Sequence, residues 1–462
     1  MRWTLGCEVG MFKSGVDRAA LLLALGVFTI KAGLAGYLGL IADEAYFWLW
    51  SKQLAWGYYD QPPLIAWLIA STSWLGREEA GVRLTALLCF GIALAALWPL
   101  ATERRLLVLG SCLPVIFGLT LLETPDAPLI AAWAVGLWAA SRGNWWLAGV
   151  ASAAAILSKH TGIFLFPLLV LGARGWRDRR MWGGAGLALA LLTPHLWWLS
   201  QHEWVTVAFQ FREGLVSETP PGLGGVAQFV VTQMAVGTPI LALTAMVFFA
   251  KREKDLIDRL AFWTSVPLFA FFAVGAYFAP SEAYWTAPAW VGVWLTIARP
   301  PDRGWRAAWA SVSTAALVTG LCAAHLLTPL WPFEDDPADE FEAGRSLGEA
   351  VVVWSYPVGS VLHPPAPAKA LPVWTERYQE AAWIAFYVDV PTARAPGCGR
   401  PDQFDVWATP NWESALLLRP ARGGDSTCFD AEFPDRSGPT VVQQRRDDGS
   451  IARRWQIYEV AR

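Results

Sequence analysis

The sequence predicts an α-helical polytopic membrane protein with about eleven transmembrane helices and a small C-terminal α/β domain. Apolar residues make up 55% of the 462 residues and charged residues only 16%, whereas a soluble protein carries about 25% charged residues. The chain also contains 29 tryptophans, a residue that favours the membrane–water interface. The net charge is −3 and no basic tract indicates nucleic-acid binding.

Eleven apolar segments approach the length of about 20 helical residues that crosses a bilayer. Several of the middle segments are short, so one or two of them could be buried, tilted or re-entrant instead. The first segment lacks a small-residue cleavage pattern and is too long for a cleavable signal peptide, so we expect a signal anchor. The eleven segments are 19–41, 81–101, 106–122, 127–140, 145–157, 161–173, 181–199, 227–250, 260–279, 283–298 and 307–327.

The distribution of Lys and Arg predicts the orientation. With the N-terminus in the cytoplasm, the cytoplasmic segments hold seventeen Lys and Arg residues, and the opposite short loops hold four. Such an excess marks the cytoplasmic side. An odd number of spans then places residues 328–462, which are charged and rich in proline, outside as a periplasmic domain after the transmembrane domain, 1–327. The richness in Ala, Trp, Arg and Gly is typical of a GC-rich bacterium, so we expect the bacterial inner membrane.

The six cysteines show no spacing typical of a metal site. Four of them lie in or near apolar segments, where we interpret them as small buried hydrophobic residues. Cys398 and Cys428 lie in the C-terminal region and could form one disulfide if that region faces an oxidising compartment.

The first outer loop, 42–80, carries an unusual group of acids. Asp43 and Glu44 begin where the first span ends, and the aromatic residues after them fall on one face of a helix, as an interfacial helix requires. The prolines of GYYDQPPL break this helix and suit the start of a second interfacial helix, 64–75. Asp43, Glu44 and Asp60 are therefore predicted between two helices at the membrane surface. Carboxylates there are costly unless used or paired, so we predict a catalytic role; the simpler alternative is hydration and helix capping.

Other outer loops place polar residues on the same side. The sequence LLETPDAPL contains Asp126, and SKHTG contains Lys159 and His160. A lysine on the cation-poor side suits a lipid-linked phosphate, although lysine also snorkels to this depth without a function. Asp126 could alternatively cap a helix.

Two further polar positions have open interpretations. His202, in the loop 200–226, could be a metal ligand, but no HxH or HExxH spacing supports that role. Lys31 lies midway along the first span, where it could pair with an acid or snorkel.

The order of these motifs resembles the glycosyltransferase C superfamily. The motifs are DEAYFWLWS, GYYDQPPLIAWL, EAGVRL with Arg83, TPDAPL and SKHTG. The branch they resemble contains the protein O-mannosyltransferases and the aminoarabinose transferase of lipid A. HLWWLSQHEWVTVAFQFREG and SEAYWTAPAW also look like that branch, and WTERYQEAAWIAFYVDVP is similar to its outer soluble domain. The resemblance covers almost the whole chain.

The resemblance implies transfer of one sugar from an undecaprenyl-phosphate-linked donor to an acceptor at the outer membrane face, with inversion. Asp43 would then be the general base that accepts the proton of the acceptor hydroxyl. Burial between interfacial helices would raise its pKa toward a useful value. Lipid A, core oligosaccharide, another envelope glycan and protein all stay open as acceptors, and we expect the C-terminal domain to be an accessory to this site.

The resemblance also implies a cation for the lipid phosphate that leaves, because negative charge develops on it. Relatives use a divalent metal ion, basic side chains or both. Some relatives have a lysine where this chain has Gln61, so the role must lie elsewhere. The phosphate-binding candidates are Lys159, Arg83 and Arg212. The possible metal ligands are Asp60, Glu44 and His202. The substrate-binding candidates are Tyr58, Tyr59, Gln61, Asp126, His160 and Trp285.

Two other classes of membrane protein are weaker alternatives. A transporter or flippase of lipid-linked sugars requires charged residues in the middle of several spans and paired broken helices. Here charge within the spans is almost limited to Lys31, and no internal repeat is visible. An O-antigen ligase usually has its large outer loop between spans, whereas the large outer segment here is C-terminal.

Overall fold

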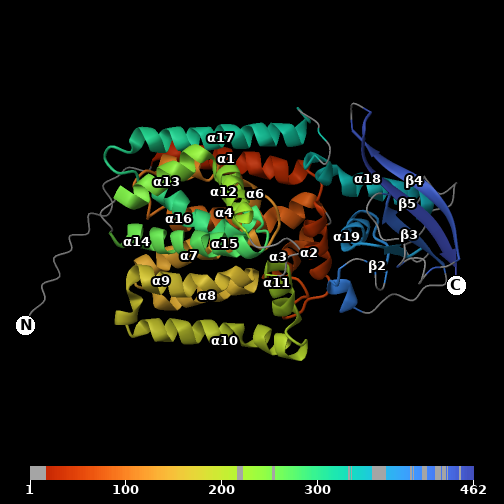
Figure 1. Ribbon diagram of the computed structural model, residues 1–462, viewed down its shortest axis with the longest axis horizontal. Helices are drawn as coiled ribbons and strands as arrows, with labels where there is room; N and C mark the ends of the chain where they lie inside the picture. Colours follow the sequence, from red (N-terminus) through yellow and green to blue (C-terminus); the bar gives the residue numbers. More distant parts are fainter. Residues whose placement is uncertain are drawn as a thin grey trace, which may run out of the picture.

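The structure, a computed structural model, is a bundle of helices with a C-terminal α/β domain at one end (Figure 1). It describes residues 17–76, 78–215, 222–251, 255–330, 333, 336–355, 371–395, 398, 400–407, 414–421, 428, 433, 435–446 and 449–461.

Each of the eleven apolar segments is largely helical. The helical part consists of α1 (Arg18–Tyr37), α2 (Ala42–Trp50), α3 (Leu64–Thr72), η1 (Ser73–Leu75), α4 (Glu79–Leu97), α5 (Arg104–Gly110), α6 (Pro114–Leu119), α7 (Asp126–Ser141), α8 (Trp145–Ser158), η2 (His160–Phe164), α9 (Leu165–Ala173), η3 (Gly175–Arg177), α10 (Arg180–Gln201), α11 (Val205–Leu215), α12 (Leu223–Gly237), α13 (Pro239–Lys251), α14 (Leu256–Trp263), α15 (Val266–Phe278), η4 (Ala283–Thr286), α16 (Ala287–Ile297) and α17 (Trp305–Leu327).

Helix length alone supports fewer spans than the sequence pattern. In the described part of the chain, four helices are long and apolar enough to cross a membrane: α1, α4, the run 256–278 and α17. The pair α12 and α13, which is bent by 100°, makes a fifth if its two halves count as one span. The segment 106–122 is divided because Pro114 starts a new helix at α6. The predicted number of eleven therefore rests on the sequence pattern.

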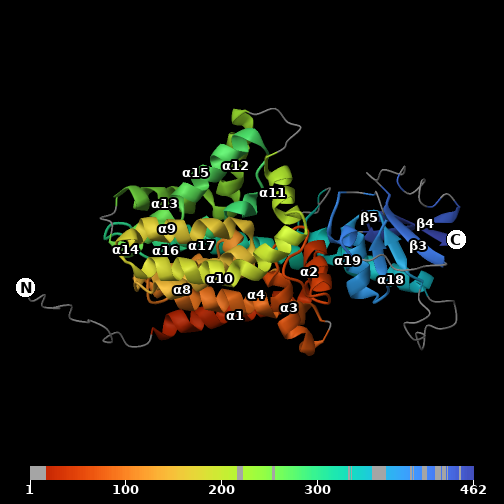
Figure 2. The same cartoon turned by 90° about the horizontal axis from the view of Figure 1, so that it is seen from below.

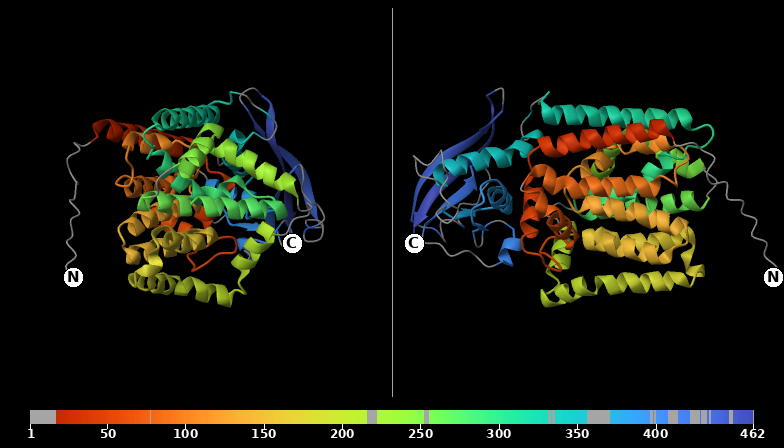
Figure 3. Two further views of the ribbon diagram at one scale, coloured as in Figure 1. Left: turned by 60° about the vertical axis from the view of Figure 1, so that its left-hand side comes forward. Right: turned by 180° about the vertical axis from the view of Figure 1, so that it is seen from behind.

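The predicted alternation of loops between the two sides agrees with the contacts between them. Arg299 forms ion pairs with Asp255 at 2.6 Å and Asp258 at 3.0 Å, and it donates to the carbonyl of Leu100 at 2.6 Å. Asp255 and Asp258, Arg299, and Leu100 belong to the segment 251–259, the segment 299–306 and the end of the span 81–101. The distribution of Lys and Arg predicts all three at the cytoplasmic side. Helix α1 begins at the end of the bundle remote from the C-terminal domain, and α17 leads back to that domain (Figures 2 and 3).

Lys31 is fully buried and does not pair with an acid among the residues that the structure describes. Its Nζ donates to the carbonyl of Phe117 at 2.6 Å and to Oγ1 of Thr120 at 3.0 Å. The ammonium also lies 4.1 Å from the centre of the Phe117 ring and 4.9 Å from that of Phe90. Lys31 thus satisfies carbonyl and hydroxyl groups at the end of α6 and ties α1 to it.

Helices α2 and α3 lie at the end of the bundle that faces the C-terminal domain (Figures 1 and 2). One hydrophobic core joins α2 and α3 to that domain, with Trp48 on α2 packed edge-on against Phe386 at 5.0 Å. Trp383 donates through its indole N–H to the carbonyl of Leu40 at 3.0 Å. A side chain at Gly39 would collide with the carbonyl of Phe341, so glycine permits this close approach. The first outer loop therefore packs as part of the C-terminal domain.

In the described residues, the C-terminal domain contains a five-stranded mixed sheet, two α-helices and a 3₁₀ turn. The strand order is β2-β1-β3-β5-β4, in which β1 is parallel to β2 and β3, and β5 is antiparallel to β3 and β4. The elements are α18 (Ala338–Ser355), β1 (Val373–Thr375), α19 (Tyr378–Tyr387), β2 (Thr392–Arg394), η6 (Gln403–Asp405), β3 (Ser414–Pro420), β4 (Arg436–Arg445) and β5 (Ile451–Ala461).

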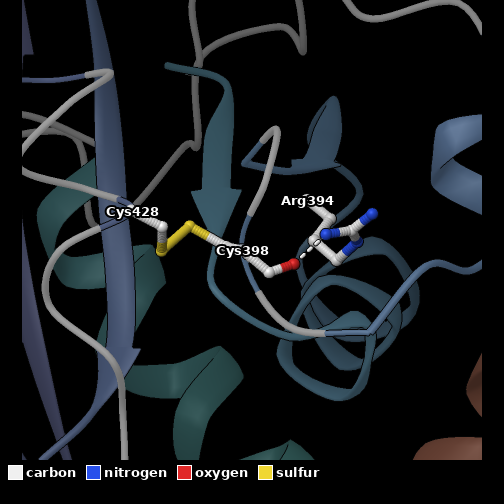
Figure 4. The surroundings of a disulfide bond; sticks show 3 residues. All are labelled: Arg394, Cys398 and Cys428. Carbon is white, nitrogen blue, oxygen red and sulfur yellow. Dashed lines mark hydrogen bonds between the residues drawn. A yellow bond between two sulfur atoms is a disulfide. The ribbon is translucent and has the colours of Figure 1, made fainter.

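Cys398 and Cys428 form the disulfide that the sequence left possible, with their Cα atoms 5.3 Å apart (Figure 4). The bond joins the segment after β2 to the connection between β3 and β4. Arg394 donates to the carbonyl of Cys398. The pairing is typical of an oxidising compartment.

A buried ion pair anchors the start of α2 to the bundle. The guanidinium of Arg83 on α4 binds both carboxylate oxygens of Glu44 at 2.7 and 2.5 Å, and both side chains are fully buried. Arg83 also donates to the carbonyls of Ala35, Leu38 and Gly39 at the end of α1. Glu44 accepts in addition from the backbone N–H groups of Ile41 and Glu123. The pair thereby joins α1, α2, α4 and the loop before α7.

Removing the cation of this pair should destabilise the protein strongly. In Arg83→Gln the Glu44 carboxylate stays buried without its partner, a loss of about 3–5 kcal/mol. Thermal unfolding of the detergent-purified protein measures this loss of stability. The control is Arg345→Gln, which breaks a partly exposed pair with Glu79 (2.8 Å) and should cost about 1 kcal/mol or less. Equal losses in the two variants would contradict the structural role of the Arg83–Glu44 pair.

Candidate active site

Asp43 occupies the first turn of α2 and points away from the bundle core. Its side chain is exposed to solvent, and Oδ1 accepts a hydrogen bond from the Tyr378 hydroxyl of α19 at 2.9 Å. Asp43 has no ion-pair partner among the described residues, whereas Glu44 binds Arg83 and Asp60 binds Arg400. Of the three acids predicted for this loop, Asp43 is thus the one whose carboxylate can meet a substrate.

The surroundings of Asp43 tune its basicity. Protein around the carboxyl displaces water and raises its pKa. The negative charges of Asp60 and Glu340 raise the pKa further, while the hydrogen bond from Tyr378 and the charge of Arg400 act in the opposite direction. The net effect is a pKa above the ordinary value of 3.8, which suits a general base.

Asp60 holds the C-terminal domain against the first outer loop. Its Oδ1 accepts from Arg400 Nη1 at 2.7 Å, and its Oδ2 accepts from the Tyr46 hydroxyl at 2.9 Å. Tyr46 in turn accepts from the backbone N–H of Gln403 at 2.7 Å. The guanidinium of Arg400 lies 5.0 Å from the centre of the Tyr378 ring. This position suits Asp60 to hold in place the residues that surround Asp43.

A second charged pair lies on the bundle side of the site. Lys159, directly after α8, contacts both carboxylate oxygens of Asp126 at 2.8 and 2.9 Å. Its Nζ also lies 4.5 Å from the centre of the Tyr284 ring. Tyr284 lies close enough to Asp126 and Asp43 for both negative charges to act on it. Tyr284 therefore lies within the field of both carboxylates and connects the pair to the first loop.

Several buried polar atoms beside this pair have no hydrogen-bond partner in the described part of the chain. His160 and Thr161 follow Lys159 directly, Thr124 lies two residues before Asp126, and Ser281 lies three residues before Tyr284. The atoms are both ring nitrogens of His160, Oγ1 of Thr161 and Thr124, Oγ of Ser281 and Oε1 of Gln61. An unpaired buried polar group costs about 1–3 kcal/mol. Hydroxyl-rich ligands can satisfy such groups.

The remaining candidates are divided between the site and the core. Arg212 on α11 is exposed, and its charge reaches Tyr59. Tyr59 packs edge-on against Phe209 at 5.5 Å. Tyr58 is fully buried and stacks on Trp50 at 4.4 Å, so its position favours packing over substrate binding. Trp285 packs near Phe272, and its neighbour Tyr284 makes the contact with Lys159.

The three possible metal ligands do not come together. Glu44 binds Arg83, Asp60 binds Arg400, and His202 stacks on Trp198 at 3.9 Å. Within the ranges that the structure describes, no group of three or more His, Cys, Asp or Glu side chains is close enough to hold a metal ion. The described residues therefore do not fit a metal centre. The burial of Glu44 and Arg83 likewise does not support the catalytic and phosphate-binding roles predicted for them.

The sequence missed the residues that the C-terminal domain contributes. Tyr378 contacts Asp43 directly and Arg400 binds Asp60, so the domain that we expected to be an accessory contributes two side chains to the surroundings of Asp43. The motif WTERYQEAAW, which contains Tyr378, was the available signal. Nothing in the sequence around Arg400 relates it to a loop 340 residues earlier.

Comparisons with known proteins agree with this architecture. Residues 60–198 match the family described as dolichyl-phosphate-mannose-protein mannosyltransferase. The chain is 26% identical over 332 residues to the lipid A galacturonosyltransferase RgtD of Rhizobium johnstonii, covering 62% of this chain and 67% of the relative. Its fold is similar to that of ArnT from Cupriavidus metallidurans, solved bound to undecaprenyl phosphate, with a TM-score of 0.62 and 15% identity over 96% and 98% of the two chains.

The matching family covers the second half of the first outer loop and the helices that carry Asp126 and Lys159. The similarity in fold extends over nearly the whole chain, including the C-terminal domain. Together, the family match, the relative and the similar fold support a membrane glycosyltransferase of the glycosyltransferase C superfamily, in the branch that contains the protein O-mannosyltransferases and the lipid A aminoarabinose transferase.

Proposed function

We propose that the enzyme transfers a single sugar from an undecaprenyl-phosphate-linked donor to lipid A or a related envelope glycolipid on the periplasmic face of the inner membrane. The observation that carries the proposal is Asp43, an exposed carboxylate without an ion-pair partner in the described chain, at the junction of the bundle and the C-terminal domain. The relative acts on lipid A by its name, and ArnT binds undecaprenyl phosphate. Both support this donor and acceptor class.

In the proposed reaction Asp43 acts as the general base. It accepts the proton of the acceptor hydroxyl while the hydroxyl oxygen bonds to the anomeric carbon of the donor sugar. The bond between that carbon and the phosphate oxygen breaks, and undecaprenyl phosphate leaves with the bonding electrons. Attack opposite to the leaving group inverts the anomeric centre. The Tyr378 hydroxyl holds the carboxylate in place.

Lys159 and Arg212 are the cations that we assign to the leaving phosphate. Lys159 lies beside Tyr284 at the bundle side of Asp43, and Arg212 is exposed near Tyr59. A cation there stabilises the charge that develops as the bond breaks. The unpaired groups of His160, Gln61 and their neighbours are suited to the sugar hydroxyls.

The periplasmic orientation is supported by three features. Lys and Arg are concentrated in the opposite loops. The Cys398–Cys428 disulfide suits an oxidising compartment. The exposed carboxylate, the proposed phosphate-binding cations and the disulfide-bonded domain all belong to the side that the charge count places outside.

Replacing the proposed base tests the mechanism. Purified enzyme is incubated with a panel of undecaprenyl-phosphate sugars, galacturonic acid included, and release of undecaprenyl phosphate is measured in the presence of lipid A. Asp43→Asn keeps the shape and should lower kcat about 10²–10⁴-fold because the base is lost. Asp302→Asn, at an exposed position on the opposite side, should keep the wild-type rate. Normal turnover by Asp43→Asn, or no donor consumed by the wild type, would overturn the proposal.

The pH dependence tests the environment of Asp43. The base works when deprotonated, so kcat/KM should fall as the pH decreases through its raised pKa. Tyr378→Phe removes a hydrogen bond that stabilises the carboxylate. The decrease of kcat/KM at low pH, which is the acid limb of the profile, should therefore occur at higher pH. Tyr458→Phe, elsewhere in the same domain, serves as the control and should leave the limb in place. An acid limb that stays fixed or moves to lower pH in Tyr378→Phe would argue against Asp43 as the titrating base.

Binding of undecaprenyl phosphate tests the two cations. Lys159→Gln and Arg212→Gln should each weaken the binding about tenfold or more, because a charge-assisted hydrogen bond contributes about 1.5–3 kcal/mol. Native mass spectrometry of the detergent-purified protein measures the affinity. Lys52→Gln removes a first-loop cation that lies over Trp48 instead and should bind normally. Wild-type affinity in both test variants would require another phosphate site.

A further inference from the structure

A large cavity in the C-terminal domain is not used by the reaction described above. It has a volume of about 880 Å³ and lies between the N-terminal ends of α18 and α19 and the strand β5. Pockets for small ligands commonly measure about 300–1,000 Å³. The space is therefore sufficient for a saccharide headgroup.

Arginine dominates the lining of this cavity. Four arginines, Arg377, Arg446, Arg453 and Arg454, face three acids, Asp336, Asp339 and Glu340. The lining therefore carries one net positive charge.

The acids of the lining are already engaged. Asp339 binds Arg446 at 2.5 Å, and Glu340 binds Arg453. Asp336 pairs with His325 at 3.0 Å and accepts from a backbone N–H. Arg446 and Arg453 are thus paired within the lining, whereas among the described residues Arg377 and Arg454 have no acidic partner in the lining.

The arginines retain capacity to bind an anion. A guanidinium has five N–H donors and a carboxylate occupies two at most in a bidentate pair. Arg377 finds its partner Glu380 outside the lining. Arg454 is exposed and has no hydrogen bond or ion pair from its side chain within the described residues. The cavity thus presents N–H groups that match the oxygens of a phosphate or carboxylate.

The cavity adjoins the loop that carries the proposed base. Glu340 in its wall accepts from the backbone N–H of Ala42, the residue before Asp43, at 3.4 Å. Tyr378, which donates to Asp43, stands between the lining residues Arg377 and Gln379. A ligand held in the cavity can therefore present a hydroxyl to Asp43 while the donor phosphate lies beside Lys159.

We propose that this cavity is the acceptor-binding site and that it takes a saccharide headgroup bearing phosphate or carboxylate. The inference rests on the proposed function, because it assigns the second substrate of the same reaction. It also makes the C-terminal domain the part of the enzyme that selects the acceptor.

Binding of soluble saccharides to the full-length detergent-purified protein tests the site. Three probes are titrated by calorimetry: a glucosamine disaccharide with one phosphate, its dephosphorylated form, and a disaccharide in which one sugar is a uronic acid. We expect at least one anionic probe to bind about tenfold or more tightly than the neutral one. The affinities of the phosphate-bearing probe and the uronic-acid probe show which anion the site recognises. Equal affinity for all three probes, or no binding of any, would overturn the proposal.

Two substitutions locate the binding in the cavity. Arg454→Gln should weaken binding of the preferred anionic probe about tenfold, and Ala452→Trp should block it by filling the volume without changing the charge. Arg445→Gln removes an exposed arginine of the neighbouring strand that is not part of the lining, and it should bind like the wild type. Wild-type affinity in both test variants would show that the anion binds elsewhere.

Donor measurements separate this inference from the proposed function. Arg454→Gln should raise the KM for the acceptor about tenfold and leave the affinity for undecaprenyl phosphate unchanged. If the wild type consumes no donor but binds the anionic saccharide through Arg454, the proposed reaction fails and the binding site stands. If donor is consumed but the Arg454 and Ala452 variants keep the wild-type acceptor KM, the cavity is not the acceptor-binding site, whereas the proposed reaction is upheld.

Discussion

The buried ion pair between Glu44 and Arg83 determines where the first outer loop leaves the bundle. Burying two charges is expensive, and the cost is offset because the guanidinium also binds three carbonyls of the turn after α1. Adjacent residues of an α-helix differ in direction by roughly 100°. When Glu44 is drawn into the bundle, Asp43 must therefore point elsewhere, toward the C-terminal domain. Glu44 thus stabilises the fold, and the adjacent Asp43 is exposed and can contact a substrate.

The proposed site is assembled from two parts of the chain, the helical bundle and the C-terminal domain. The bundle supplies Asp126, Lys159 and Tyr284, and the C-terminal domain supplies Tyr378 and Arg400. Helix α2 belongs to the transmembrane part by sequence but shares its hydrophobic core with the C-terminal domain. This packing explains how a soluble domain can align a tyrosine with a carboxylate that begins an interfacial helix.

The charges divide the surroundings of Asp43 into two regions with different partners. On the bundle side, Lys159 and the unpaired polar groups near His160 suit a sugar linked to a lipid phosphate. On the domain side, the arginine-lined cavity suits an anionic acceptor. In the proposed reaction the donor and the acceptor approach Asp43 from these two regions.

The sequence by itself determined the helical membrane architecture, the alternation of loops and the acidic first loop. These follow from composition, apolar segments and prolines, which act locally: Pro62 and Pro63 directly precede α3, which begins at Leu64. Only the tertiary structure decided what each polar side chain does. Glu44 and Asp43 are both acids in the same helical turn, and their roles diverge because Arg83, 39 residues away, reaches only one of them. Long-range contacts of this kind, like those of Tyr378 and Arg400, leave no local pattern in the sequence.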